Sequence, residues 1–187
     1  NFENGDKIGF TMAKVNGTEN YADNACLTFN GNVFSGDLMW YADAYSEADV
    51  YAYYPYKENG VPTAYFCVYD QTEGIGAADF MAASKKGVLP TPNAITMVFK
   101  HMMTKIVVNI DNVSGATVEN VVLTGSAASA SLDIENQTVT AAAETADIKA
   151  YDASAGKVWN AIIIPGTAKL ELAVSLSNGK KITQPLA

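Results

Sequence analysis

Apolar and polar residues alternate along most of the chain, and this period of two restricts the fold more than any other feature of the sequence. The alternation is clear at residues 6–12 and recurs, less strictly, at 63–69 and 95–99. Successive side chains of a strand point to opposite faces of a sheet, so these segments are predicted to be half-buried strands. Further runs rich in β-branched or alternating apolar residues lie at 105–110, 118–123, 131–134, 138–140, 158–164 and 170–176.

Turn signals separate the predicted strands at short intervals. Pro165-Gly166 is typical of a tight turn, and Asn178-Gly179 predicts a two-residue hairpin. Glu135-Asn136-Gln137 is predicted to be the loop of another hairpin. Only residues 77–84 and the Ala-rich stretch after Ala141 hint at helix. The chain is therefore predicted to be all-β, with antiparallel strands packed as a β-sandwich.

A Pro-rich segment, Leu89-Pro90-Thr91-Pro92-Asn93, divides the chain into halves of similar length. Two prolines this close cannot occupy a central strand, because each lacks the backbone N–H that a ladder needs. We predict two small domains, an N-terminal β-sandwich at residues 1–90 and a second one at 94–187, incomplete at its C-terminal end. A chain of 187 residues is long enough to give each a core.

Composition and charge exclude several classes of protein. Hydrophobic residues make up 49% of the chain and charged residues 17%, which is typical of an ordered globular protein. The net charge of −8 argues against a nucleic-acid partner, since phosphate binding needs clusters of basic residues. No apolar run is long enough to predict a membrane-spanning helix, and the first residues do not resemble a signal peptide.

The sequence offers little for catalysis or metal binding. His101 is the only histidine, and its position beside a predicted strand favours a structural role. No nucleophile elbow or phosphate-binding loop is present. Cys26 and Cys67 lie in strand-like stretches and are expected to be buried free thiols, with a single bridge as the alternative. We therefore expect no catalytic, cofactor-binding or metal-binding residues, no cofactor, and no enzymatic activity.

Residues 50–56 are the most aromatic stretch of the chain, with four tyrosines before and after Pro55. Their alternation places Tyr51 and Tyr53 on one face of a strand, and Ala52 and Tyr54 on the other. A core strand is favoured over the alternative, a sugar-stacking platform formed by the tyrosines with Trp40.

The densest group of carboxylates is Asp43, Glu47 and Asp49. Calcium binding is disfavoured there, because the spacing is not that of an EF-hand loop and the loop glycine is missing.

Short motifs follow one another in order along nearly the whole chain. They are Gly5-Asp6-Lys7-Ile8-Gly9, Met39-Trp40, Ala52-Tyr53-Tyr54-Pro55-Tyr56, Gln71 followed by Asp79-Phe80-Met81-Ala82-Ala83, the run from Phe99 to Val108, and Ile163-Ile164-Pro165. In this order they resemble the fimbrillins, which are the type V pilin subunits of Bacteroides-type bacteria. No single motif is specific, and the resemblance rests on the whole series.

The resemblance implies transthyretin-like, Greek-key β-sandwiches and a structural or adhesive subunit of a bacterial surface fimbria. It implies a lipoprotein precursor at the outer membrane, whose N-terminal segment an Arg-specific protease removes. Subunits then polymerise by donor-strand exchange, in which a strand from one subunit fills a groove in the next. The expected partners are other pilin subunits and a host or bacterial surface ligand. The alternative is a glycan- or host-ligand-binding accessory or tip protein on the cell surface.

Two features of the sequence bear on this maturation. All 12 basic residues are lysines, which either composition bias or survival of an Arg-specific protease explains. Asn1 is expected to follow such a cut. Members of the family usually continue past the Asn178-Gly179 hairpin with a further strand, so the last strands are expected to be missing here or the protein to be a short member.

Overall fold

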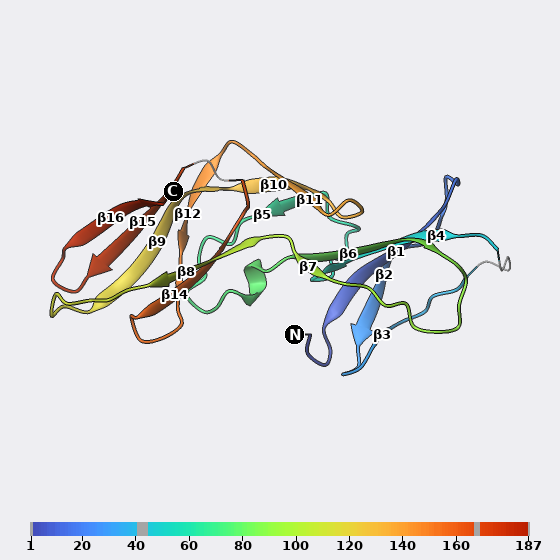
Figure 1. The fold of residues 1–187 in the computed structure, drawn as a ribbon, viewed down its shortest axis with the longest axis horizontal. Coiled ribbons are helices and arrows are strands. Elements are labelled where there is room, and N and C mark those ends of the chain that lie inside the picture. The colour runs from blue at the N-terminus through green and yellow to red at the C-terminus, as the bar shows by residue number, and fades with distance from the viewer. Residues whose placement is uncertain (1, 41–44, 167–168, 187) are drawn as a thin grey trace. The chain divides into compact units, whose positions relative to one another are not determined.

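A computed structural model describes residues 2–40, 45–166 and 169–186 (Figure 1). Strands dominate this part of the chain, and neighbouring strands in its sheets pair antiparallel. The helical structure in the same residues is limited to one 3-10 turn, η1 (Gly76–Ala78). The predicted all-β, antiparallel fold is therefore confirmed.

The chain forms two compact units, each assembled from several segments. The first contains residues 1–63, 80–102 and 132–138, and the second contains residues 64–79, 103–131 and 139–187. These units show where contacts concentrate and do not test which parts fold independently. The domains at 1–90 and 94–187 remain a prediction.

The first unit is built on one sheet with the strand order β3-β2-β1-β4-β6-β7. The strands are β1 (Lys7–Lys14), β2 (Asn20–Phe29), β3 (Phe34–Ser35), β4 (Ala48–Tyr54), β6 (Met81–Val88) and β7 (Lys100–His101). The two central strands, β1 and β4, pair with Phe10 opposite Ala52 and Met12 opposite Val50. Because the sequence alternates, these residues share one face of the sheet, where they form a buried apolar cluster.

The remaining strands belong mainly to the second unit and form three smaller sheets, with the orders β12-β9-β15-β16, β13-β14-β8 and β11-β10-β5. Their strands are β5 (Ala64–Phe66), β8 (Thr104–Asn109), β9 (Val118–Ala127), β10 (Ser129–Asp133), β11 (Thr138–Ala141), β12 (Thr145–Lys149), β13 (Tyr151–Asp152), β14 (Val158–Ile163), β15 (Leu170–Leu176) and β16 (Lys181–Leu186). Val121, Leu123 and Ile148 have no exposed surface and lie at the centre of this core.

Most predicted turns are confirmed. β4 ends at Tyr54, directly before Pro55, as the missing proline N–H requires. Asn178-Gly179 joins β15 to β16, and the loop at 135–137 lies between β10 and β11.

Both helical hints are wrong. Of residues 77–84, only 77 and 78 belong to η1, while Met81–Ser84 lie in β6 and pair with β4. The stretch after Ala141 contains β12. Pairing with a neighbouring strand outweighs the helix propensity of alanine in both places.

Candidate functional site

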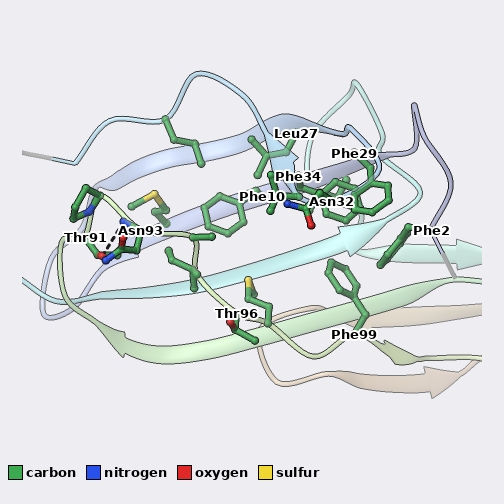
Figure 2. Close-up of a pocket in the computed structure, with 18 of the residues that line it drawn as sticks. Phe2, Phe10, Leu27, Phe29, Asn32, Phe34, Thr91, Asn93, Thr96 and Phe99 are labelled. Carbon is green, nitrogen blue, oxygen red and sulfur yellow. Dashed lines mark hydrogen bonds between the residues drawn. The ribbon is translucent and has the colours of Figure 1, made fainter.

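An open apolar groove of about 720 Å³ runs along the inner face of the sheet in the first unit (Figure 2). Its floor is made of Ile8, Phe10 and Met12 from β1, with Leu27 and Phe29 from β2. Every second residue of β1 reaches this floor because of the strand's alternation. Ile8, Phe10, Met12 and Leu27 are buried, and they belong to the apolar cluster that forms the core of the unit.

Two segments form the lips of the groove. The first lip, residues 32–40, follows β2 and contributes Val33, Phe34, Leu38 and Trp40. The second lip, residues 91–99, lies between the Pro-rich segment and β7. The polar residues of the lining are threonines and asparagines, and no charged side chain lines the groove in the part of the chain that the structure describes. Such a lining suits an apolar ligand and offers no group for acid–base chemistry.

The second lip has the side-chain pattern of a strand but no strand partner among the described residues. Ile95, Met97 and Phe99 are half-buried against the core cluster, whereas Thr96 and Val98 are exposed, Val98 at 73%. Among the residues that the structure describes, none forms a backbone ladder with residues 94–99. The predicted strand at 95–99 is therefore extended and alternating, as expected, but its backbone groups are left for water or for another chain.

Aromatic rings close one end of the groove. The Phe2 ring lies edge-on to Phe34 at 4.9 Å and to Phe99 at 5.1 Å between ring centroids, so it contacts both lips. It also meets Tyr54 at 5.4 Å and Phe29 at 6.2 Å. Near the other end, the Asn93 N–H donates to Thr91 Oγ1 over 3.0 Å, which keeps that end polar.

A hydrogen-bond network on the opposite face of the sheet holds the floor strands in place. Tyr53 is 1% exposed, and its hydroxyl donates to Asn24 Oδ1 over 2.6 Å and accepts from the Lys57 N–H over 3.2 Å. Asn24 sits in a bulge of β2 with a positive φ of 50°, and its N–H donates to the buried Thr11 hydroxyl over 3.1 Å. The bulge turns the Asn24 side chain toward Tyr53 and so ties β2 to β4 across β1.

The predicted aromatic platform does not form a single exposed surface. Tyr53 is buried and stacks on Phe80 at 6.0 Å, while the Tyr54 hydroxyl donates to Asp6 Oδ1 over 3.1 Å on the other face. Tyr51, Tyr54 and Tyr56 are half-buried, and Trp40 lies at the groove. The alternation argument, which favoured a core strand over a sugar-stacking surface, agrees with this arrangement.

The other residues singled out from the sequence are not among the described residues that line the groove. Asp43 lies outside the described residues, and Asp49 Oδ1 accepts the Gly87 N–H over 2.9 Å. His101 is an exposed residue of β7. Both cysteines are free, but Cys26 is exposed, so its expected burial is wrong. It lies on β2 beside Leu27, which takes the core-facing position.

Gln71 is a buried polar side chain of the second unit. It is 1% exposed, and its amide donates to Ile162 O over 2.8 Å and to Val68 O over 3.0 Å, while its Oε1 accepts the Ile162 N–H over 2.8 Å. The side chain thus acts as a ladder partner for β14. Its role is structural, which explains why a lone glutamine is part of the motif series.

Neither a metal centre nor a membrane helix emerges from the described residues. No group of His, Cys, Asp and Glu side chains among them is placed to hold a metal ion. Within the same ranges, no helix is long and apolar enough to cross a bilayer. The expected absence of catalytic and cofactor-binding residues remains a prediction.

The position of the groove was not predicted from the residues. The resemblance implied a groove but not its location, and the alternation at 95–99 indicated an ordinary paired strand. The available signal was the Pro-rich segment directly before this strand, because it sets residues 94–99 off from the preceding strand β6.

Three solved structures that resemble this chain come from Bacteroides. A structure described as a "putative cell adhesion protein" from Bacteroides uniformis superposes with a TM-score of 0.78 at 22% identity, over 98% of this chain and 78% of that one. A similarly described protein from Bacteroides ovatus superposes with a TM-score of 0.73 at 22% identity, over 98% of this chain and 77% of that one. A fimbrial protein from Bacteroides ovatus superposes with a TM-score of 0.60 at 17% identity, over 98% of this chain and 41% of that one. At these identities the structures establish the fold.

The sequence comparison identifies the family. No curated protein sequence matches the chain. The family model described as fimbrillin-like matches residues 1–187, the whole of the sequence. The motif series, the all-β fold and this full-length match agree, and the chain belongs to the fimbrillin-like family.

Proposed function

We propose that the protein is a structural or adhesive subunit of a bacterial surface fimbria, and that its groove receives a strand from another subunit. One observation carries the proposal. Residues 94–99 of the second lip alternate as a paired strand does and border an uncharged apolar groove, yet no described strand pairs with them. A strand laid along it would gain a backbone ladder and would bury alternate apolar side chains on the floor.

The energetics favour such an occupant over a small polar ligand. Apolar surface removed from water stabilises a complex by about 25 cal/mol per Å², and the floor and lips are lined mainly by aliphatic and aromatic groups. An unpaired strand beside an open apolar groove is also an aggregation hazard, which a donated strand would remove.

The names of similar proteins support a location at the cell surface. One is a fimbrial protein, and two are described as cell adhesion proteins. For this chain we propose the same setting, with a lipid-anchored precursor at the outer membrane. We further propose that an Arg-specific protease releases an N-terminal segment and frees the groove. The absence of arginine from the sequence supports this step, because the protease would find no second cutting site.

A charge placed in the groove tests the proposal. Met97→Lys puts an ammonium group on the groove side of the second lip, whereas Val98→Lys puts the same group on the exposed side. In cells that carry each variant in place of the wild-type gene, we expect filaments with Val98→Lys and none with Met97→Lys. Electron microscopy with surface immunolabelling measures the filaments of the two strains, and urea unfolding of the purified subunits checks that both variants are folded.

The outcomes separate the roles within a fimbria. Filaments of normal number and length in the Met97→Lys strain would refute strand insertion in this groove. Unchanged filaments after deletion of the gene, with no surface labelling of the wild type, would refute the fimbrial role. Labelling confined to filament ends would instead support the alternative of an accessory or tip protein.

A further inference from the structure

The aromatic end of the groove is occupied by a residue of the chain itself. The Phe2 ring fills the space between Phe34 on the first lip and Phe99 on the second, with centroid distances of 4.9 Å and 5.1 Å (Figure 2). The same ring contacts Tyr54 of β4 at 5.4 Å. Edge-to-face contacts at these distances are favourable, so the ring has a preferred place there.

The turn that follows Phe2 holds the ring in this position. The Glu3 N–H donates to Asp6 Oδ2 over 2.8 Å, and the Asp6 N–H donates to Glu3 O over 3.0 Å. The Gly5 N–H donates to Phe29 O over 2.9 Å, which attaches the turn to β2. The Tyr54 hydroxyl donates to Asp6 Oδ1 over 3.1 Å, which attaches it to β4. Phe2 is therefore anchored to two strands of the sheet, β2 and β4, through the turn that follows it.

Resting on the proposed strand-acceptor function, we propose that Phe2 is a register stop for the inserted strand. A strand that pairs with the second lip directs alternate side chains toward the floor, beside Ile95, Met97 and Phe99 in turn. The place beside Phe99 is already filled by the Phe2 ring. The side chains of the strand can therefore occupy the places beside Ile95 and Met97, and the strand must end or turn away before the place beside Phe99.

This stop has a consequence for specificity. A one-residue slip of a strand moves all of its apolar side chains to the wrong face, and a two-residue slip keeps the faces but changes which side chain meets which part of the floor. The backbone ladder does not distinguish the two-residue slips, because it repeats every second residue. A fixed obstacle at one end does distinguish them, and Phe2 is a positioning residue in this sense.

Peptides of stepped length test the stop. The probes are acetylated and amidated synthetic peptides of alternating Val and Thr, with Lys pairs at the ends, lengthened by two residues at a time. Binding to the whole purified chain is measured by isothermal titration calorimetry and by the change in tryptophan emission, to which Trp40 contributes from the lining of the groove. For the wild type, we expect affinity to rise with length and then level off.

The variants of Phe2 carry the test. Phe2→Ala vacates the aromatic end, so affinity should continue to rise for one further step, with the longest peptides binding about tenfold tighter than to the wild type. Phe2→Leu keeps most of the volume and should level off as the wild type does. Val113→Ala, at a residue that is 91% exposed in the second unit, should change nothing.

The result that would overturn the stop is a Phe2→Ala protein that binds peptides but levels off at the same length as the wild type. Circular dichroism shows whether that protein is folded. If Phe2→Ala is unfolded, Phe2→Trp decides, because the bulkier ring should weaken the binding of the longest peptides that the wild type accepts. Binding of no peptide to any variant would refute the strand-acceptor function itself, and the register stop with it.

Discussion

Gly9 and Tyr53 are direct partners on β1 and β4, and the Tyr53 ring occupies the space that a side chain at position 9 would need. A Cβ atom on Gly9 would lie 2.7 Å from the Tyr53 hydroxyl oxygen and closer still to two ring carbons. Gly9 and Tyr53 belong to two motifs that are far apart in the sequence, and these motifs contact each other in the fold. The glycine is needed for the close approach of the ring.

Gly9→Ala should therefore destabilise the protein by about 1–3 kcal/mol, as overpacking of a core commonly does. Urea unfolding followed by circular dichroism measures the change. The matched control is Gly76→Ala, because a Cβ at that position meets no atom within 4 Å. Equal unfolding midpoints for the two variants would contradict this account of the Gly9 motif.

Gln71→Leu should cost about 2–5 kcal/mol of unfolding free energy. Leucine preserves much of the volume but leaves the Ile162 N–H and C=O without their buried partner, and each such loss carries a desolvation penalty. Gln184→Leu, on the exposed strand β16, is the control and should be within about 0.5 kcal/mol of the wild type. A small effect at Gln71 would mean that water replaces the side chain.

Tyr65 should make stability fall at alkaline pH. Its hydroxyl donates to Ala78 O over 2.8 Å. Burial, together with the nearby charges of Cys67 and Asp79, raises the pKa of Tyr65 from 10.0 to about 12. Between these values the unfolded chain releases the proton while the folded protein keeps it. The stabilising contribution is therefore complete below pH 10.0 and is lost as the pH approaches 12.

Unfolding free energies measured across that pH range check the prediction. Tyr65→Phe should lower stability by about 1 kcal/mol at neutral pH, through loss of the hydrogen bond, and should flatten the alkaline decline. Tyr45→Phe removes a phenol that is 88% exposed and serves as the control. An unchanged alkaline slope in Tyr65→Phe would show that other groups cause the decline.

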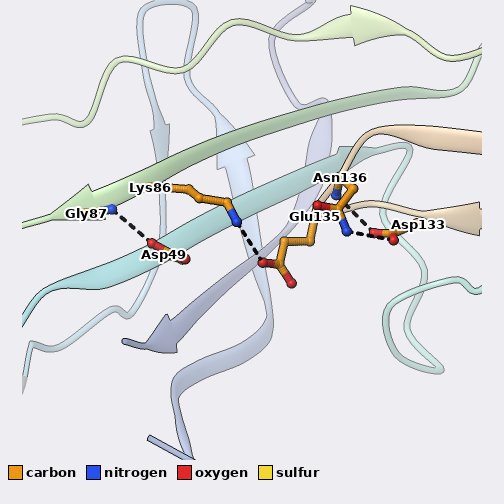
Figure 3. A network of polar contacts seen from close by, with 6 residues as sticks. All are labelled: Asp49, Lys86, Gly87, Asp133, Glu135 and Asn136. Carbon is orange, nitrogen blue, oxygen red and sulfur yellow. Dashed lines mark hydrogen bonds and ion pairs between the residues drawn. The ribbon is translucent and has the colours of Figure 1, made fainter. Parts of the chain in front are cut away.

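The ion pair between Lys86 and Glu135 should contribute little. The two groups are 3.4 Å apart, and their side chains are 64% and 45% exposed, so water screens the attraction (Figure 3). A double-mutant cycle with Lys86→Ala and Glu135→Ala should give a coupling energy below about 1 kcal/mol. A clearly larger coupling energy would show that this ion pair stabilises the first unit.

Asp133 is the useful comparison in the same loop. Its carboxylate accepts the Asn136 N–H over 2.9 Å and the Asn136 side-chain amide over 2.8 Å, which closes the turn (Figure 3). These bonds lower the pKa of Asp133. Asp133→Ala should therefore cost about 1 kcal/mol, more than the loss of Lys86, when measured in the same unfolding assay.

Local patterns predicted the strands well because their causes are local. Alternation placed β1 and β15, Asn178-Gly179 placed the hairpin to β16, and Pro55 ended β4. The helical hint at 77–84 was wrong because β6 is decided by pairing with β4, a partner about thirty residues away in the sequence. Burial of Cys26 was wrong because a strand pattern leaves open which of its two faces is the core.

The sequence by itself determined the order of the motifs along the chain, the all-β class and the fimbrillin-like family. Only the tertiary structure decided that residues 94–99 have no strand partner in the part of the chain that it describes, that an apolar groove lies beside them, and that Phe2 closes its end. The physical reason is that alternation records which side chains a strand buries, a property of each residue and its neighbours. Whether the strand's backbone groups are paired depends on segments elsewhere in the chain, and no local pattern records that.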